Sequence, residues 1–151
     1  MELIVVMGIL LLISGFVAIN LVNQQRTSSL NSSVDVLIAD IASQQTKAMS
    51  GVGGQWESTS NYGIYFEPDR YILFQGTNFL ATDSANFTVM LDKNIEFSNI
   101  TFSGNIIVFS ALSGEIMGFS DSNNTITIQD SAGSENKTIT VNRYGVVESI
   151  N

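Results

Sequence analysis

The chain has 151 residues, enough for one modest globular domain together with an apolar membrane segment. Its 6 basic and 14 acidic residues give a net charge of -8, which argues against nucleic-acid binding, because phosphate contacts require a surface rich in lysine and arginine. The chain contains no Cys and no His, so thiol catalysis, disulfides and the commonest zinc ligands are excluded, and we expect no cofactor and no enzymatic activity.

The first predicted element is an uncharged apolar helix that begins near Leu3. No charge follows Glu2 until Arg26. At 1.5 Å per residue, a helix from Leu3 to Val22 is about 30 Å long, which is the thickness of a bilayer core. We therefore expect a transmembrane segment. A removed signal peptide and a plain anchor are the alternatives, but the segment lacks a basic start and a small-x-small cleavage site.

Glu2 is the one charged residue at the head of this apolar run. An ionised carboxylate at the edge of a membrane segment is costly unless it has a partner. This position favours an assembly device over a simple anchor. The alternative is a carboxylate that sits hydrated among lipid headgroups.

The helix is predicted to continue past the apolar run. Apolar residues recur there at helical spacing and form a stripe on one face: Leu30, Val34, Leu37, Ile38 and Ile41. Gly51, Gly53 and Gly54 then end the pattern. We expect one long helix from Leu3 to about Ser50, whose second half packs its stripe against a sheet.

After residue 54 the pattern changes to short β-branched and aromatic runs separated by turn residues. Strands are predicted at Tyr62–Phe66, Arg70–Phe74, Phe87–Leu91, Ile95–Phe97, Ile106–Phe109, Glu115–Phe119, Thr125–Gln129, Thr138–Val141 and Val146–Ile150. The Glu67-Pro68-Asp69-Arg70 segment and the Asn142–Gly145 segment are predicted turns.

Together these elements predict an α+β fold, in which a long N-terminal membrane-spanning helix packs on an antiparallel β-sheet domain. The expected divisions are the transmembrane or assembly half of the helix over residues 1–22, its amphipathic half with a glycine-rich linker over 23–54, and a β-rich globular domain over 55–151.

The run from Glu2 to Leu10, ELIVVMGIL, resembles the N-terminal segment of type IV pilins and type II secretion pseudopilins. In that family a short leader ends in Gly, and an aromatic residue, three further residues and a Glu follow the cleavage site. Glu2 corresponds to that Glu, so the leader and the first mature residues would stand upstream of Met1. The helix lacks the proline that many pilins carry in this part.

The rest of the chain is similar to the GspH/FimT-type pseudopilins. The stretches that carry this likeness are Tyr62-Gly63-Ile64-Tyr65-Phe66, Tyr71-Ile72-Leu73-Phe74, Gly114-Glu115-Ile116, Lys137-Thr138-Ile139-Thr140-Val141 and Tyr144-Gly145-Val146-Val147. They resemble the family's strands and turns in order and spacing.

The resemblance implies a structural subunit, a minor pseudopilin of a type II secretion pseudopilus or a type IV pilus. The implied assembly residues are Glu2, Leu3, Val6, Gly8, Leu10 and Ile13. Implied partners are other pilin subunits, the inner membrane, a prepilin peptidase and an assembly machinery. The implied location is the inner membrane, with the C-terminal domain outside the cytoplasm and the filament form in the periplasm or outside the cell.

In such a filament, Glu2 would neutralise the amino terminus of a neighbouring subunit, because an unpaired charge inside an apolar bundle costs several kcal/mol. It would thereby set the axial register between subunits.

Two other functions remain open. One is a membrane-tethered binding module, an adhesin or a sensor, that never polymerises; the sequence upstream of Met1 would discriminate. The other is a DNA-uptake minor pilin, which requires a basic patch, whereas the C-terminal tail carries Arg143 beside Glu148.

The acidic residues of the second half give little sign of chemistry. Asp121 and Asp130 could offer oxygen ligands to calcium, but their spacing matches no known loop pattern. The acidic cluster around Glu67 and Asp69 is typical of a solvated turn.

Overall fold

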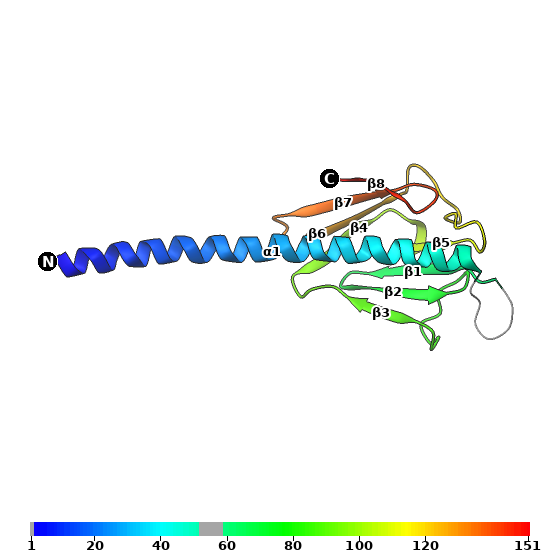
Figure 1. Ribbon diagram of the computed structural model, residues 1–151, viewed down its shortest axis with the longest axis horizontal. Helices are drawn as coiled ribbons and strands as arrows, with labels where there is room; N and C mark the ends of the chain where they lie inside the picture. The colour runs from blue at the N-terminus through cyan, green and yellow to red at the C-terminus, as the bar shows by residue number, and fades with distance from the viewer. Residues whose placement is uncertain (1, 52–58) are drawn as a thin grey trace.

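The computed structural model describes residues 2–51 and 59–151, except for the side chains of residue 2 and residues 14–24. A single α-helix, α1 (Glu2–Ser50), runs through the first third of the chain. It ends at Gly51, whose φ of +65° is a conformation that glycine adopts without strain and whose N–H reaches back 3.4 Å to the carbonyl of Ala48. The first half of α1 projects from the globular domain, and the second half lies against it (Figure 1).

The described residues after α1 form two antiparallel sheets of four strands each. The first has the order β3-β2-β1-β5 and the second the order β4-β6-β7-β8. The strands are β1 (Tyr62–Glu67), β2 (Arg70–Gln75), β3 (Phe87–Met90), β4 (Ile95–Ile100), β5 (Ile106–Phe109), β6 (Thr125–Asp130), β7 (Asn136–Val141) and β8 (Val147–Ile150). A short 3₁₀ turn, η1 (Ser103–Asn105), precedes β5.

The helix runs along the seam between the two sheets, with β1, β2 and β3 on one side of its axis and β6, β7 and β8 on the other (Figure 1). Its buried residues join the inward faces of both sheets in one core. The largest fully buried hydrophobic side chains of this core are Leu30, Leu37, Ile41, Ile64, Phe66, Tyr71, Ile107, Phe109, Ile126, Ile128 and Ile139. Burial of these apolar groups is the main term that holds the helix against the sheets.

The fold class expected from the sequence is wrong in two respects. Over the residues that the structure describes, no helix holds an apolar stretch of the length needed to cross a membrane. The β-domain is not one sheet laid on a helix but two four-stranded sheets that share the helix between them.

The β1–β2 hairpin is confirmed, with Glu67 paired to Arg70 across the Pro68-Asp69 turn. The strand predicted over Glu115–Phe119 is wrong, because this segment makes one isolated bridge, between Ile116 and Phe109. Gly114 and Gly118 flank Ile116 at φ of +67° and +66°, and the left-handed backbone on both sides leaves no extended run long enough for a strand.

The predicted strand Ile95–Phe97 is longer in the structure. β4 continues to Ile100 through a register shift between Phe97 and Asn99 in its pairing with β6. Such a shift is a β-bulge, in which one extra residue bends a strand without ending it.

Candidate assembly surface

The projecting part of α1 presents an apolar surface on every side. Leu3, Val6, Leu10 and Ile13 expose 72%, 54%, 57% and 55% of their surfaces, and a Cβ added to Gly8 would meet no atom within 4 Å. The intervening residues Ile4, Val5, Ile9, Leu11 and Leu12 are exposed to the same degree. The structure therefore places these predicted assembly residues on an uncovered helix but does not set their face apart from the others. The side chain of Glu2 lies outside the described residues.

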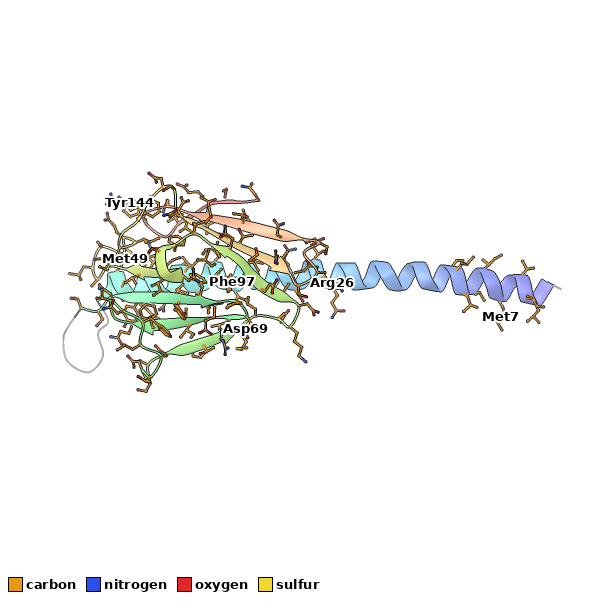
Figure 2. The ribbon with its side chains drawn as sticks, turned by 180° about the vertical axis from the view of Figure 1, so that it is seen from behind. Met7, Arg26, Met49, Asp69, Phe97 and Tyr144 are labelled. Atoms are coloured by element: carbon orange, nitrogen blue, oxygen red, sulfur yellow. The ribbon has the colours of Figure 1, made fainter. Side chains whose placement is uncertain are left out.

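In the following text, "stem" means the described side chains of residues 3–13 of α1. Figure 2 shows Met7 on the stem at one end of the molecule, and Met49 and Tyr144 at the other end. An apolar surface of this extent is uncommon on a monomeric protein and marks a contact site.

The second half of α1 holds the stem to the domain. Of the five residues predicted to pack on the sheet, Leu30, Val34, Leu37 and Ile41 are buried, and Ile38 is partly buried against the same core. Polar contacts add to this packing. Gln44 is buried and donates its Nε2 hydrogen to the carbonyl of Gly63 at 2.9 Å.

Farther along α1, the side-chain amide of Gln45 donates to the carbonyl of Tyr144. The same Nε2 lies 3.5 Å from the carbonyl of Gly114. One helix side chain thereby joins two loops at the end of the domain away from the stem.

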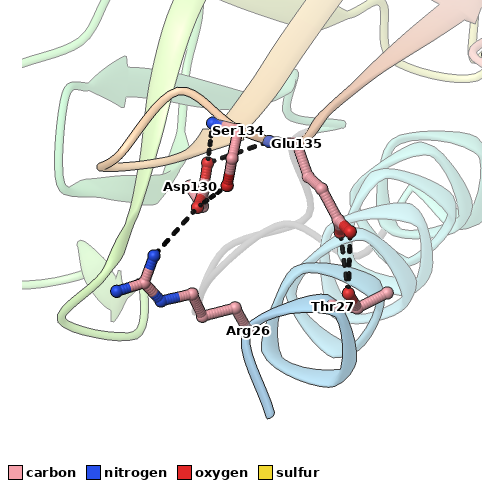
Figure 3. Close-up of polar contacts among 5 residues, drawn as sticks. All are labelled: Arg26, Thr27, Asp130, Ser134 and Glu135. Atoms are coloured by element: carbon pink, nitrogen blue, oxygen red, sulfur yellow. Dashed lines mark hydrogen bonds and ion pairs between the residues drawn. The ribbon is translucent and has the colours of Figure 1, made fainter. Parts of the chain in front are cut away.

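The helix leaves the domain at an ionic contact with the β6–β7 turn. Nη1 of Arg26 lies 3.8 Å from Oδ2 of Asp130, at the end of β6 (Figure 3). Asp130 is almost fully buried and accepts hydrogen bonds from the N–H of Glu135 at 3.0 Å and from the N–H and hydroxyl of Ser134, each at 2.7 Å. These hydrogen bonds hold the pKa of the Asp130 carboxyl below its usual range, and the bond from the Glu135 N–H has the largest effect.

A second contact lies beside the first. The hydroxyl of Thr27 is shared between the two carboxylate oxygens of Glu135, at 2.9 and 2.8 Å (Figure 3). Two consecutive helix residues, Arg26 and Thr27, therefore bind one turn of the second sheet. We call these four residues, Arg26, Thr27, Asp130 and Glu135, the exit clamp, because they lie where α1 leaves the domain. The clamp joins α1 to the β6–β7 turn by one ion pair and one shared hydroxyl.

Sequence reasoning missed the exit clamp. The sequence indicates Asp130 only as a possible calcium ligand, and it indicates no role for Arg26, Thr27 or Glu135. The sequence pattern gives no sign that Arg26 pairs with Asp130, because the two residues are far apart in the chain. A weak signal was available in the Asp-Ser-Ala-Gly-Ser-Glu segment from Asp130, because an acidic residue at the start of a turn often accepts hydrogen bonds from the turn's own N–H groups.

The other acidic and basic candidates are solvated or paired. No group of three or more Asp and Glu side chains comes together within residues 2–51 and 59–151 in a way that could hold a metal ion. Arg143 lies 3.5 Å from Glu115, and Arg70 lies 2.6 Å from Glu67 and 3.2 Å from Asp69. Both of these arginines are therefore neutralised locally rather than gathered in a basic patch.

Comparison with protein-family models, with curated proteins and with solved structures finds no match to this chain.

Proposed function

We propose that this chain is a structural subunit of a filament of the type IV pilus or type II secretion pseudopilus kind, a minor pseudopilin, in which the stems of neighbouring subunits pack together. The observation that carries the proposal is the stem itself: an uncharged helix surface, apolar all round, that its own domain leaves uncovered. Each square ångström of apolar surface removed from water contributes about 25 cal/mol, so several stems packed side by side gain a large stabilisation.

The division of α1 into two halves supports the same proposal. The second half is fixed to the sheets by a buried stripe, so the domain stays folded whatever the stem contacts. The subunit carries no chemistry of its own in this proposal. A separate ATPase would supply the energy for assembly, a prepilin peptidase would process the chain, and the assembled domain would lie outside the cytoplasm.

A substitution that places a charge on the stem tests the proposal. Leu10→Asp adds a carboxylate to an exposed position, so the domain should fold normally while stem packing loses several kcal/mol per buried charge. The measurement is the fraction of subunit recovered in sheared filaments when the full chain is expressed with its cognate assembly machinery. Val36→Asp is the matched control, because Val36 is 47% exposed on α1 but lies within the domain half.

We expect Leu10→Asp to abolish incorporation and Val36→Asp to leave it close to the parent level. Replacement of Glu2 by Ala should also impair incorporation without changing the folding of the domain. If the parent chain itself never enters a filament, and never crosslinks to sister subunits through a cysteine at position 6, the tethered adhesin or sensor becomes the better interpretation.

A further inference from the structure

A cavity of about 320 Å³ lies between α1 and the first sheet. It runs along the last turns of the helix, at the end opposite the stem (Figure 1). Its volume is at the lower end of the range of ligand pockets, about 300–1,000 Å³. Polar side chains of α1 line it, together with Phe74 of β2 and Phe87 of β3. Because Phe87 is 65% exposed, the cavity opens to solvent beside β3 and can admit a small molecule.

Gln44, which lines this cavity, is a polar residue in the buried stripe of α1. It continues the spacing of Leu37 and Ile41 and is itself 2% exposed. Its Nε2 donates to the carbonyl of Gly63, which fixes the orientation of the amide, and its Oε1 has no hydrogen-bond partner among the described residues. A buried amide oxygen without a partner is destabilising, so native proteins rarely keep one. Gln44 therefore holds an unused acceptor at the cavity, which a leucine at this position would not.

A carboxylate and an ammonium group flank Gln44 on the same side of α1. Asp40 precedes it by four residues and Lys47 follows it by three, and both line the cavity. Asp40 accepts the hydroxyl of Tyr71 on Oδ2, and its Oδ1 receives no hydrogen bond from the described residues. Lys47 is exposed and makes no ion pair within the part of the chain that the structure describes. Along the helix, the cavity thus offers an anion, a neutral acceptor and a cation in that order.

We propose that this cavity binds a free α-amino acid with an apolar side chain. The ammonium group of the ligand donates to Oδ1 of Asp40 and to Oε1 of Gln44, and its carboxylate contacts the ammonium of Lys47. The apolar side chain of the ligand lies against Phe87 and covers its exposed ring.

The spacing of the two charges fits this ligand. Asp40 and Lys47 are seven residues apart, which is about 10 Å along the axis of an α-helix. The two charged groups of an amino acid are about 3 Å apart, and a hydrogen bond at each end adds about 3 Å, so the ligand spans about 9 Å between its partners. A simple amine leaves Lys47 without a partner, and a simple carboxylate faces the negative charge of Asp40. The zwitterion is the class of ligand that uses both charges.

The experiment is a calorimetric titration of the full chain in mild detergent, with L-phenylalanine as the probe. Two analogues are the matched ligands: phenethylamine lacks the carboxylate, and N-acetyl-L-phenylalanine lacks the ammonium group. We expect saturable binding of one L-phenylalanine per chain. Each analogue should bind at least about tenfold more weakly, because each loses a hydrogen bond to a charged group. Equal affinity of L-phenylalanine and either analogue, or no saturable binding up to about 10 mM L-phenylalanine, would overturn the proposal.

Variants of the protein locate the site. Lys47→Gln should weaken the binding of L-phenylalanine at least about tenfold and should not weaken that of phenethylamine, since only the carboxylate contacts Lys47. Lys93→Gln removes an exposed lysine that does not line the cavity, so it should change neither affinity. Gln44→Met should weaken the binding of both ligands, and circular dichroism checks that its domain stays folded. If Lys47→Gln and Lys93→Gln lower the affinity equally, the ligand responds only to the overall charge of the chain and the proposal is wrong.

The site does not depend on the proposed filament. Leu10→Asp disables the stem, so L-phenylalanine should bind this variant as tightly as it binds the parent chain. If binding is lost in Leu10→Asp, the apolar stem takes up the amino acid and the cavity proposal is wrong. If L-phenylalanine binds a parent chain that never enters a filament, the cavity proposal stands and the filament proposal fails.

Discussion

The phenolic hydroxyl of Tyr71, the second residue of β2, donates a hydrogen bond of 2.6 Å to Oδ2 of Asp40 on α1. The ring is 1% exposed and packs near Phe97 with edge-to-face geometry, while Asp40 lies at the border of the core. Burial of the hydroxyl, together with its bond to the Asp40 carboxylate, raises the pKa of Tyr71 far above its usual range. This contact ties the domain half of the helix to the first sheet by a directional bond in addition to apolar packing.

Tyr71→Phe should therefore destabilise the domain while leaving its fold unchanged. A hydrogen bond to a charged group contributes about 1.5–3 kcal/mol, and Asp40 can recover part of this from water, so we expect a loss of about 1–2 kcal/mol. The measurement is urea unfolding of the full chain in detergent, monitored by far-ultraviolet circular dichroism, which reports on the backbone. Tyr144→Phe, at a position 52% exposed, is the matched control and should change the free energy of unfolding by less than about 0.5 kcal/mol.

The same contact predicts a loss of stability at alkaline pH. The folded state keeps the proton on Tyr71 at a pH where an unfolded tyrosine, with a pKa of about 10, has released it. The contribution of this residue is therefore fully present below pH about 10 and declines above it, by about 1.4 kcal/mol per pH unit until the folded-state pKa is reached. Unfolding free energies measured from pH 9 to 11 should show this slope in the parent chain and a shallower one in Tyr71→Phe. Identical slopes would contradict the assignment.

The sequence predicted those features that depend on local periodicity. The four-three-four spacing of Leu30, Val34, Leu37 and Ile41 is a property of the chain alone, and all four are buried. Alternation of Ile126 and Ile128 with threonines likewise indicated a strand with one buried face, as β6 has. Hydrophobic periodicity alone cannot show how the strands divide into two sheets, because the division depends on which distant segments pair with each other.

Contacts between distant polar residues were beyond prediction for the same reason. Arg26 lies 3.8 Å from Asp130, and Gln44 donates to the carbonyl of Gly63, but neither side chain differs in type or spacing from solvent-exposed neighbours. The strand wrongly expected around Ile116 shows a related limit. Whether a glycine adopts an extended or a left-handed backbone is decided by the loop around it, and Gly114 and Gly118 both adopt the left-handed one.

Gly63 is predicted to tolerate no side chain. A Cβ at this position of β1 would stand 2.3 Å from Cζ of the buried Phe74 and 2.8 Å from the carbonyl oxygen of Ile107 in the adjacent strand β5. The phenyl ring could shift only by disturbing the aromatic contacts of Phe74, and the backbone of a paired strand cannot retreat. Gly63→Ala should cost about 1–3 kcal/mol of unfolding free energy.

Gly8→Ala is the matched control for this substitution, since a Cβ on the stem meets nothing within 4 Å and alanine is the better helix former. Both variants are compared with the parent chain by urea unfolding of the domain. If both substitutions change the free energy of unfolding by the same small amount, β1 and β5 can move apart enough to accept a side chain at position 63, and the prediction is wrong.

The exit clamp predicts a measurable effect on the direction of the stem. Arg26→Gln with Thr27→Val removes the charge that faces Asp130 and the hydroxyl that Glu135 accepts, while Leu30 and the rest of the buried stripe stay in place. Arg26 is 40% exposed, and the buried Asp130 carboxylate keeps its three hydrogen bonds from Ser134 and Glu135. An ion pair with one exposed partner contributes about 0–1 kcal/mol, so the stability of the domain should change little. The helix, however, loses its polar attachment to the β6–β7 turn, and the stem should sample a wider range of directions.

The range of stem directions can be measured as a distance distribution between spin labels on Val6→Cys and Asp121→Cys, which are the only cysteines in the labelled chain. We expect one narrow distribution in the parent chain and a broader one in the double variant. Arg143→Gln, which breaks the Arg143–Glu115 pair, should leave the distribution narrow. If the double variant is as narrow as the parent, the buried stripe alone sets the direction of the stem, and the clamp merely orders the β6–β7 turn.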